Sequence, residues 1–363
     1  EPEGNATGGE ARPLLSIRNL CKTFHAEGGP VHAVGGLTLD VREGEVMAWL
    51  GHNGAGKTTT ISMMTGAYGP TSGDATVAGH SIVGGMDEIR KITGLCPQHD
   101  ALFDMLTVRE HLVLFAGLRG IAPRDAEADI ERLLKSAGIK HKEHALSKDL
   151  SGGMKRSLCC ALAFVGDAKL VFLDEPSSGV DTSLRRTIWS LIESERSRRA
   201  IVLTTHSMDE ADALCDRIAI MARGQLQCLG SPLFLKNRFG VGYTLRVSRH
   251  EGTNSRALVE TVTGMIRGAV VTTEDGSETT FGLPNAATPS FPEALKVLDD
   301  DADKNGGGGK RRSSSSSSLG VSSYMLSATT LEHVFLHITR AAEHGGEGGV
   351  APPQQQQQQQ QQQ

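Results

Sequence analysis

The stretch from Gly51 to Thr58 carries the clearest chemical signal in the sequence. It fits the pattern G-x-x-x-x-G-K-[S/T] of a phosphate-binding loop, in which glycines let backbone N–H groups surround phosphate oxygens. Lys57 is expected to reach the β- and γ-phosphates, and the Thr58 hydroxyl to ligate Mg²⁺. Kinases, GTPases and motor ATPases share this loop, so it indicates only a nucleoside triphosphate; a chance glycine-rich turn is the alternative. The residues expected to bind the nucleotide are Gly51, His52, Asn53, Gly54, Ala55, Gly56, Lys57, Thr58 and Thr59.

Two adjacent carboxylates, Asp174 and Glu175, end the apolar run 169–173. Successive strand residues point to opposite faces, so the two acids are expected to do different work. We predict that Asp174 joins the Mg²⁺ shell and that Glu175 orients and deprotonates an attacking water. A solvated turn is the alternative, which the position of this strand downstream of the loop disfavours.

His206 stands at the end of another buried run, 200–206. Ligands of open parallel sheets bind at the carboxyl ends of strands, where His206, Asp174 and the phosphate loop are expected to meet. A lone histidine is usually structural, but converging polar groups favour a contact with the γ-phosphate.

A second glycine-rich segment, Ser151-Gly152-Gly153, precedes a predicted helix and offers backbone donors to an anion. A phosphate held by the first loop cannot easily touch this segment in the same monomer. We therefore expect Ser151 to Gly153 to serve the nucleotide of another copy.

Phe24 is an aromatic residue upstream of the loop. Its ring either stacks on an adenine base or fills the core at a strand end, and the residues alone leave both readings open.

Apolar periodicity predicts the elements that position these residues. The run 46–50 indicates a buried strand before the loop, and 58–66 a helix closed by glycine. Short antiparallel strands are expected to sit beside the loop strand. They cover residues 14–20, 31–34 and 37–41.

A helical subdomain is predicted between about Asp104 and Ala163, interrupting the α/β core. Thr107 and Glu110 form a capping box that opens a helix to about Leu118. A second helix is predicted over 125–137, with its apolar residues at helical spacing.

Composition limits the functional classes. The chain has 363 residues, a net charge of −5 and 4% aromatic residues, which argues against nucleic acid as the main partner. Its six cysteines match neither a zinc site nor a disulfide framework, so reduced thiols in a cytosolic protein are expected. The sequence contains no apolar run of about 18 residues, no signal peptide and no initial Met. We interpret it as a piece of a longer polypeptide, with any membrane-spanning part outside it.

In combination, these motifs resemble the nucleotide-binding domain of an ABC transporter, over about Leu14 to Tyr243. The Q-loop of the family falls on Gln98, its signature on 150–154 and its D-loop on 177–181. The resemblance implies an α/β phosphate-loop ATPase fold with an antiparallel β subdomain and a helical subdomain. The implied domain spans residues 13–241, with the helical subdomain over about 104–163.

The resemblance also implies the cofactors, ATP and Mg²⁺, and a role for each residue. Gln98 touches Mg²⁺ or water and couples to the membrane domain, and Phe24 becomes the adenine-stacking ring. Two nucleotide domains close head to tail, so that Ser151, Gly152 and Gly153 act in trans. The implied catalytic residues are Glu175, His206 and Gln98, and the implied metal ligands are Thr58, Gln98 and Asp174.

Two departures from the general family pattern look like subfamily A, namely Met154 in the signature and Gly179-Val180 in the D-loop. The segments 51–54 and 96–107 agree, and the first nucleotide domain of that subfamily is the closer match. Its members are typically lipid exporters or floppases. The resemblance therefore implies a place at the cytosolic face of a membrane, with transmembrane domains, a second nucleotide domain and a lipid substrate as partners.

The last third, 242–342, has the predicted order βαββαβ, which suggests a ferredoxin-like module. It resembles the regulatory domain that follows each nucleotide domain in subfamily A. A disordered insertion is predicted at 299–319, either a passive loop or a substrate for a basophilic kinase. The tails 1–12 and 343–363 are predicted to be disordered.

Three functions remain to be distinguished. The first is the ATP-hydrolysing engine of a membrane transporter. The second is a soluble ABC ATPase acting on nucleic acid or ribosomes, which the acidic balance disfavours. The third is a nucleotide sensor without turnover, against which Glu175 and His206 speak.

Overall fold

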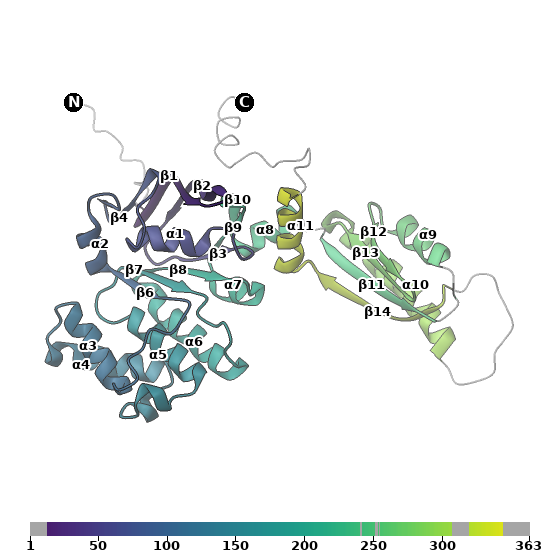
Figure 1. The fold of residues 1–363 in the computed structure, drawn as a ribbon. Coiled ribbons are helices and arrows are strands. Elements are labelled where there is room, and N and C mark those ends of the chain that lie inside the picture. Colours follow the sequence, from purple (N-terminus) through teal and green to yellow (C-terminus); the bar gives the residue numbers. More distant parts are fainter. Residues whose placement is uncertain (1–12, 240–241, 251–252, 254, 307–318, 344–363) are drawn as a thin grey trace, which may run out of the picture. The chain divides into compact units, whose positions relative to one another are not determined.

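The computed structural model describes residues 13–239, 242–250, 253, 255–306 and 319–343. The described chain divides into two compact units (Figure 1). The first comprises the described residues up to Pro232 and those from Ala341 on, and the second spans Leu233–Arg340. The predicted domain boundary at residues 241 and 242 stays a prediction. The predicted tails lie outside the described residues, apart from Glu343, which ends the last helix. No helix among the described residues combines the length and apolar character needed to cross a membrane.

A six-stranded sheet forms the centre of the first unit, in the order β10-β9-β3-β8-β7-β6. The strand β3 pairs in parallel with β8 and β9, and β7 pairs in parallel with β8 and β6. Residues of β3, β7 and β8 are buried throughout, as continuous apolar runs in a parallel sheet require. The bounds are β3 Val46–Leu50, β6 Thr93–Cys96, β7 Leu170–Asp174, β8 Ala200–Thr205, β9 Arg217–Ala222 and β10 Gln225–Gly230.

The antiparallel strands form a second sheet, in the order β2-β1-β4-β5, rather than extending the sheet of β3. The expectation that they sit beside β3 is thus wrong for strand pairing, because β8 and β9 already occupy both edges of β3. The predicted strands 31–34 and 37–41 are parts of one strand, β2, whose register against β1 shifts. The bounds are β1 Leu15–Ala26, β2 Gly29–Val41, β4 Ser72–Val77 and β5 His80–Ser81.

One apolar core joins these two sheets through the helix after the loop. Leu15 and Ile17 of β1, Met64 of that helix and Trp49 of β3 belong to the same cluster, and all are fully buried. The burial of such side chains is the main force that fixes the loop on its scaffold. The helices of this α/β part are α1 Lys57–Met64, α2 Met86–Ile92, α6 Thr182–Glu195 and α7 Met208–Leu214.

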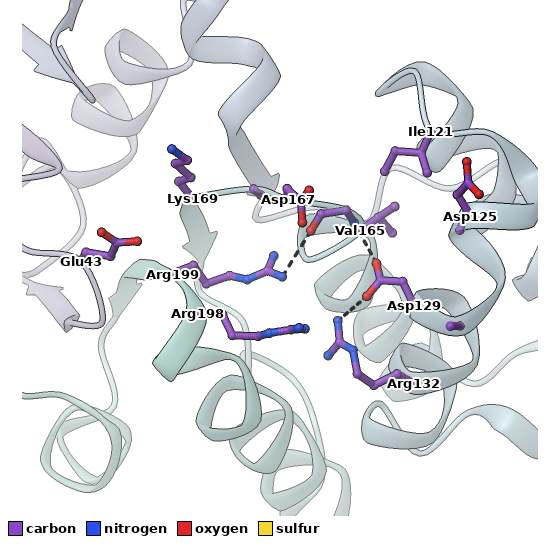
Figure 2. Close-up of a pocket in the computed structure, with 14 residues that line it drawn as sticks. Glu43, Ile121, Asp125, Asp129, Arg132, Val165, Asp167, Lys169, Arg198 and Arg199 are labelled. Carbon is purple, nitrogen blue, oxygen red and sulfur yellow. Dashed lines mark hydrogen bonds and ion pairs between the residues drawn. The ribbon is translucent and has the colours of Figure 1, made fainter.

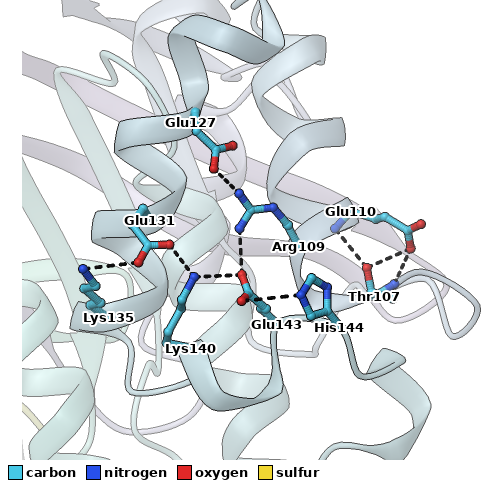
Figure 3. Close-up of polar contacts among 9 residues, drawn as sticks. All are labelled: Thr107, Arg109, Glu110, Glu127, Glu131, Lys135, Lys140, Glu143 and His144. Carbon is cyan, nitrogen blue, oxygen red and sulfur yellow. Dashed lines mark hydrogen bonds and ion pairs between the residues drawn. The ribbon is translucent and has the colours of Figure 1, made fainter.

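The helical part lies between β6 and β7, as the sequence predicts. The capping box is confirmed, since the Thr107 hydroxyl accepts the Glu110 N–H and the Glu110 carboxylate accepts the Thr107 N–H. Figure 3 shows ion pairs that connect these helices, in which Arg109 binds both Glu127 and Glu143. The bounds are α3 Val108–Leu118, α4 Pro123–Ser136 and α5 Gly152–Ala163, with 3₁₀ turns η1 Lys140–Lys142, η2 Ser147–Asp149 and, beyond α6, η3 Arg196–Arg198.

The second unit contains a four-stranded antiparallel sheet in the order β12-β13-β11-β14. Its elements follow the expected βαββαβ order, and the ferredoxin-like assignment itself stays a prediction. Leu245, Val262 and Phe281 belong to its separate core. The bounds are α8 Pro232–Phe239, β11 Tyr243–Arg249, α9 Ser255–Met265, β12 Val270–Asp275, β13 Glu278–Leu283, η4 Asn285–Ser290, α10 Phe291–Gly306, β14 Val321–Ala328 and α11 Leu331–Glu343.

The predicted disordered insertion at 299–319 is wrong at its start, because α10 continues to Gly306. The buried Asp301 carboxylate accepts the N–H groups of Leu319 and Val321, each at 3.0 Å. Asp299 also accepts the Tyr324 hydroxyl at 2.7 Å. These acidic residues therefore tie the helix to β14. Residues 307–318, with the predicted kinase-substrate segment, lie outside the described residues.

Candidate functional site

The phosphate loop connects the end of β3 to the start of α1, as the sequence predicts. Gly56 stands at the helix N-cap with φ +97°, a conformation that only glycine adopts readily. A Cβ at Gly56 would lie 2.5 Å from the Ala33 carbonyl oxygen, and one at Gly51 would lie 2.6 Å from the Met221 carbonyl oxygen. The backbone packing thus leaves no room for side chains at these two loop positions. This geometry suits a loop whose N–H groups surround a phosphate.

Lys57 is the cation of this loop and is only 6% exposed. Its ammonium donates hydrogen bonds to the carbonyl oxygens of Gly51 at 2.6 Å and His52 at 3.2 Å. Burial lowers the pKa of Lys57, and the charges of Glu175 and Asp174 oppose that shift. A buried ammonium held by neutral carbonyls gains from a nearby polyanion, which favours phosphate binding here.

Thr58 and Asp174 meet at the carboxyl edge of the sheet. The Thr58 hydroxyl donates to Asp174 Oδ1 at 3.4 Å, and Asp174 is 4% exposed. A hydroxyl beside a carboxylate is an oxygen donor set that suits Mg²⁺ when phosphate oxygens complete the coordination. No cluster of three or more His, Cys, Asp or Glu residues suited to a metal occurs in the described part of the chain.

A cavity of about 520 Å³ brings together residues from four predicted motifs. His206 Nδ1 lies 3.4 Å from Glu175 Oε2; the imidazole is 63% exposed and the carboxylate side chain 10%. A histidine and a carboxylate that face one cavity can contact a phosphate and a water there. The residues that line it are His52, Asn53, Gln98, Glu175 and His206.

Glu175 differs from the sequence prediction in one respect. It follows the end of β7 and has φ +51°, so Asp174 and Glu175 are not successive strand residues. The two acidic side chains therefore point in different directions because the backbone turns at Glu175, and not because strand residues alternate. A left-handed conformation at a residue other than glycine is uncommon and marks a position that its surroundings hold in place.

The second glycine-rich segment begins α5. Ser151 is the N-cap residue, and its hydroxyl accepts the Met154 N–H at 3.3 Å. A Cβ at Gly152 would meet nothing within 4 Å, so this helix N-terminus is open. Neither Ser151, Gly152 nor Gly153 lines the cavity that His52 and Asn53 share with Glu175. The structure therefore does not join the two glycine-rich segments into one site within the chain.

Phe24 lies at the far end of β1 and is half-buried. Its ring forms a T-shaped pair with the Tyr68 ring at a centroid separation of 5.5 Å, and Lys22 Nζ lies 5.1 Å from the Phe24 centroid. Tyr68 was not singled out from the sequence. The Phe24 ring is neither fully buried nor isolated, which fits a surface where a base could stack.

Arg156 is a buried residue that sequence reasoning missed. From α5, its guanidinium donates to the Pro97 carbonyl oxygen at 2.6 Å, beside Gln98, and to the carbonyl oxygens of Asp174 at 2.5 Å and Glu175 at 3.0 Å. It thus connects the Q-loop, the acidic strand end and the helix of the second glycine-rich segment. A basic residue after a glycine pair gives no sequence signal of such burial.

A larger cavity of about 810 Å³ lies at the opposite edge of the sheet, where Lys169 precedes β7 and Arg199 precedes β8 (Figure 2). Its lining carries both signs of charge. Arg132 is paired with Asp129, and Arg199 donates to backbone carbonyl oxygens. This cavity contains none of the predicted site residues.

Residues 34–178 match the family model described as "ABC transporter". The chain is 40% identical over 94% of its length to the phospholipid-transporting ATPase ABCA3 of Rattus norvegicus, and covers 19% of that protein. It is also 40% identical to ABC transporter A family member 2 of Dictyostelium discoideum, with 92% of this chain and 20% of that protein covered. The chain thus spans about a fifth of the length of these relatives.

Solved structures share the fold of part of the chain. A structure of an ATP-binding subunit of an ABC transporter matches with TM-score 0.57 and 27% identity, covering 62% of this chain and 93% of that one. A dimeric post-hydrolysis ATP-binding cassette bound to ADP and Pi matches with TM-score 0.56 and 20% identity, covering 60% and 98%. The second match supports the fold alone.

Proposed function

This chain contains the ATP-binding domain of an ABC transporter and resembles subfamily A, and from that premise we propose that it binds Mg²⁺–ATP and hydrolyses it to drive transport across a membrane. The observation that carries the proposal is the shared cavity of His52, Asn53, Gln98, Glu175 and His206 beside the buried Lys57. In phosphoryl transfer the protein contributes mostly positioning and charge stabilisation, which such a convergence provides.

Each residue has a proposed role in this reaction. Phe24 stacks on the adenine, Lys57 and the loop N–H groups hold the phosphates, and His206 contacts the γ-phosphate. Thr58, Asp174 and Gln98 would hold Mg²⁺, which would neutralise charge on the phosphates. Glu175 takes the proton of the attacking water, and the position of its carboxylate beside His206 supports this role.

Hydrolysis requires a second nucleotide domain. The N-terminus of α5 at Ser151 to Gly153 is open and takes no part in the cavity of its own chain. We propose that it completes the site of a partner domain, in the same polypeptide or another copy, and that the partner's equivalent segment completes this one. Closure of the pair then drives the transport step.

Transmembrane domains are the proposed second partner. Phe103 and Met105, which follow the Q-loop, are 56% and 70% exposed, and Leu118 of α3 is 74% exposed. The Phe103 N–H donates to His111 Nε2 at 2.9 Å, which anchors this apolar loop on α3. Exposed apolar residues next to the Q-loop suit a docking surface for a membrane domain. We propose that the chain works at the cytosolic face of a membrane.

Phospholipid is the substrate class that the names of relatives support, since ABCA3 is named a phospholipid-transporting ATPase. We propose a lipid exporter or floppase, whose lipid binds to the transmembrane domains and not to this chain. The net charge of −5 gives no support to nucleic acid as a partner.

The test compares wild type, Lys57→Ala and Glu175→Gln in the full-length protein. ATP binding should fall at least about tenfold in Lys57→Ala and stay within about threefold in Glu175→Gln, which should lose turnover. Wild-type protein that binds ATP without hydrolysing it would establish the sensor instead. A full-length protein without membrane-spanning segments would refute the transporter assignment.

A further inference from the structure

Thr204 is a fully buried polar residue at the end of β8, beside the site but outside the predicted motifs. In the parallel pairing of β7 with β8, it stands opposite Asp174. A hydroxyl at a central strand position must find partners, because burying it without hydrogen bonds costs free energy. The partners that it finds are both acidic residues of the site.

The Thr204 hydroxyl donates a hydrogen bond to Asp174 Oδ1. The same carboxylate oxygen accepts the Thr58 hydroxyl at 3.4 Å, so the bond from Thr204 fixes the oxygen that faces the phosphate loop. Hydrogen bonds from neighbours orient the carboxylates that ligate metals, and loss of such a neighbour lowers metal affinity or activity by about 10- to 100-fold.

The same hydroxyl also accepts the Glu175 N–H at 3.0 Å. The Thr204 carbonyl oxygen accepts this N–H as well, at 3.1 Å. Glu175 has φ +51°, a conformation that persists at a residue other than glycine only where the surroundings impose it. Thr204 therefore holds the backbone that aims the Glu175 carboxylate toward His206.

We propose that Thr204 is a positioning residue for ATP hydrolysis, whose single hydroxyl fixes both the Asp174 carboxylate and the Glu175 backbone. A threonine hydroxyl has one donor and two acceptor lone pairs, so it can serve both acids at once. This inference rests on the proposed function, because it assigns Thr204 to the reaction at that site. A valine of similar shape would keep the strand and remove both hydrogen bonds.

The test uses Thr204→Val and Thr204→Ser in the full-length protein, with hydrolysis measured against Mg²⁺ concentration. Thr204→Val should raise the Mg²⁺ concentration for half-maximal hydrolysis and lower kcat, each by about tenfold or more. Binding of ATP without Mg²⁺ should stay within about threefold, because no hydrogen bond joins Thr204 to Lys57 in the described part of the chain. Thr204→Ser should restore both values to within about threefold of wild type.

Thr93→Val is the matched control. Thr93 lies on β6 of the same sheet, and its buried hydroxyl has no hydrogen-bond partner, so its loss should leave the Mg²⁺ dependence unchanged. If Thr204→Val does not fold, Thr204→Ala replaces it with the same expectations.

The outcomes separate this inference from the proposed function. Wild-type protein without Mg²⁺-dependent hydrolysis would refute the proposed function. Active wild type with an unchanged Mg²⁺ dependence in Thr204→Val would refute the role of Thr204 alone. Equal losses in Thr204→Ser and Thr204→Val would also overturn it, because a general packing defect would then explain them.

Discussion

Replacement of Arg156 offers a quantitative test of how the site is held together. The Arg156 side chain is 5% exposed, and its guanidinium pairs with Asp100 at 3.2 Å. The guanidinium also donates to the carbonyl oxygens of Pro97, Asp174, Glu175 and Pro176. Arg156→Ala would remove all of these hydrogen bonds, although the Glu175 carbonyl oxygen would still accept the Ser178 N–H. A hydrogen bond to a charged group contributes about 1.5–3 kcal/mol, but several bonds from one side chain are not additive.

We therefore expect Arg156→Ala to lower the free energy of unfolding of the first unit by about 3–5 kcal/mol, the range for breaking a buried charged network. Arg156→Lys keeps the charge, but an ammonium cannot donate to all these oxygens as the planar guanidinium does. Its loss of unfolding free energy should therefore be smaller, about 1–3 kcal/mol. Both tryptophans, Trp49 and Trp189, lie in the first unit. Urea titrations followed by tryptophan fluorescence thus report the unfolding of that unit.

The control is Arg90→Ala, since the Arg90 side chain is 58% exposed and its one ion pair among the described residues is with the exposed Asp87. Its effect should stay within about 0.5 kcal/mol. A loss of less than about 1 kcal/mol in Arg156→Ala would contradict a stabilising role of this network, because it would mean that the carbonyl oxygens find other partners at little cost.

Three further predictions concern other parts of the chain. Phe24→Ala should weaken ATP binding by about 10- to 100-fold, because base stacking contributes about 1–3 kcal/mol. Phe24→Tyr should weaken it little, and calorimetry measures both affinities. Equal affinities of wild type and Phe24→Ala would exclude stacking. At pH 8 the thiol of Cys21 should react with Ellman's reagent, since the other five cysteines are buried. Burial also raises the pKa of Cys228 to about 12, which keeps that thiol protonated. Rapid reaction of all six thiols would contradict the burial of the five. Asp301→Ala should destabilise the second unit by about 1–3 kcal/mol in thermal unfolding, because it removes two buried hydrogen bonds. The control Asp300→Ala, at an exposed position, should not. Equal effects of the two substitutions would mean that the Asp301 hydrogen bonds do not stabilise the packing of α10 on β14.

Local sequence signals predicted most of the site scaffold. The strand before the loop was expected at 46–50, and β3 has those bounds, because a short apolar run that ends at glycine is unambiguous. The capping box at Thr107 was also predictable, since its partners lie three residues apart. Roles that need only local geometry can be inferred from such patterns.

Long-range contacts could not be predicted in the same way. Thr204 and Arg156 look like ordinary strand and helix residues, and only the pairing of β7 with β8 and the packing of α5 bring them to Asp174. The strands β9 and β10 were not assigned at all. The end of α10 was missed because the burial of Asp301 depends on β14, which follows in the sequence. An acidic run alone suggests a solvated linker.

The most direct test of the central claim is the fate of the nucleotide bound to this chain in the full-length protein. ATP with an azide on its adenine and a radiolabel on its α-phosphate would be bound with Mg²⁺ and crosslinked. Digestion would then assign the label to the segment from Phe24 to Tyr68, which carries the proposed base contact and the phosphate loop. We expect labelled ADP on the wild-type segment and labelled ATP on Glu175→Gln, because only the carboxylate can take the proton of the attacking water. The same proportion of ADP on both proteins, or no label on this segment, would contradict it.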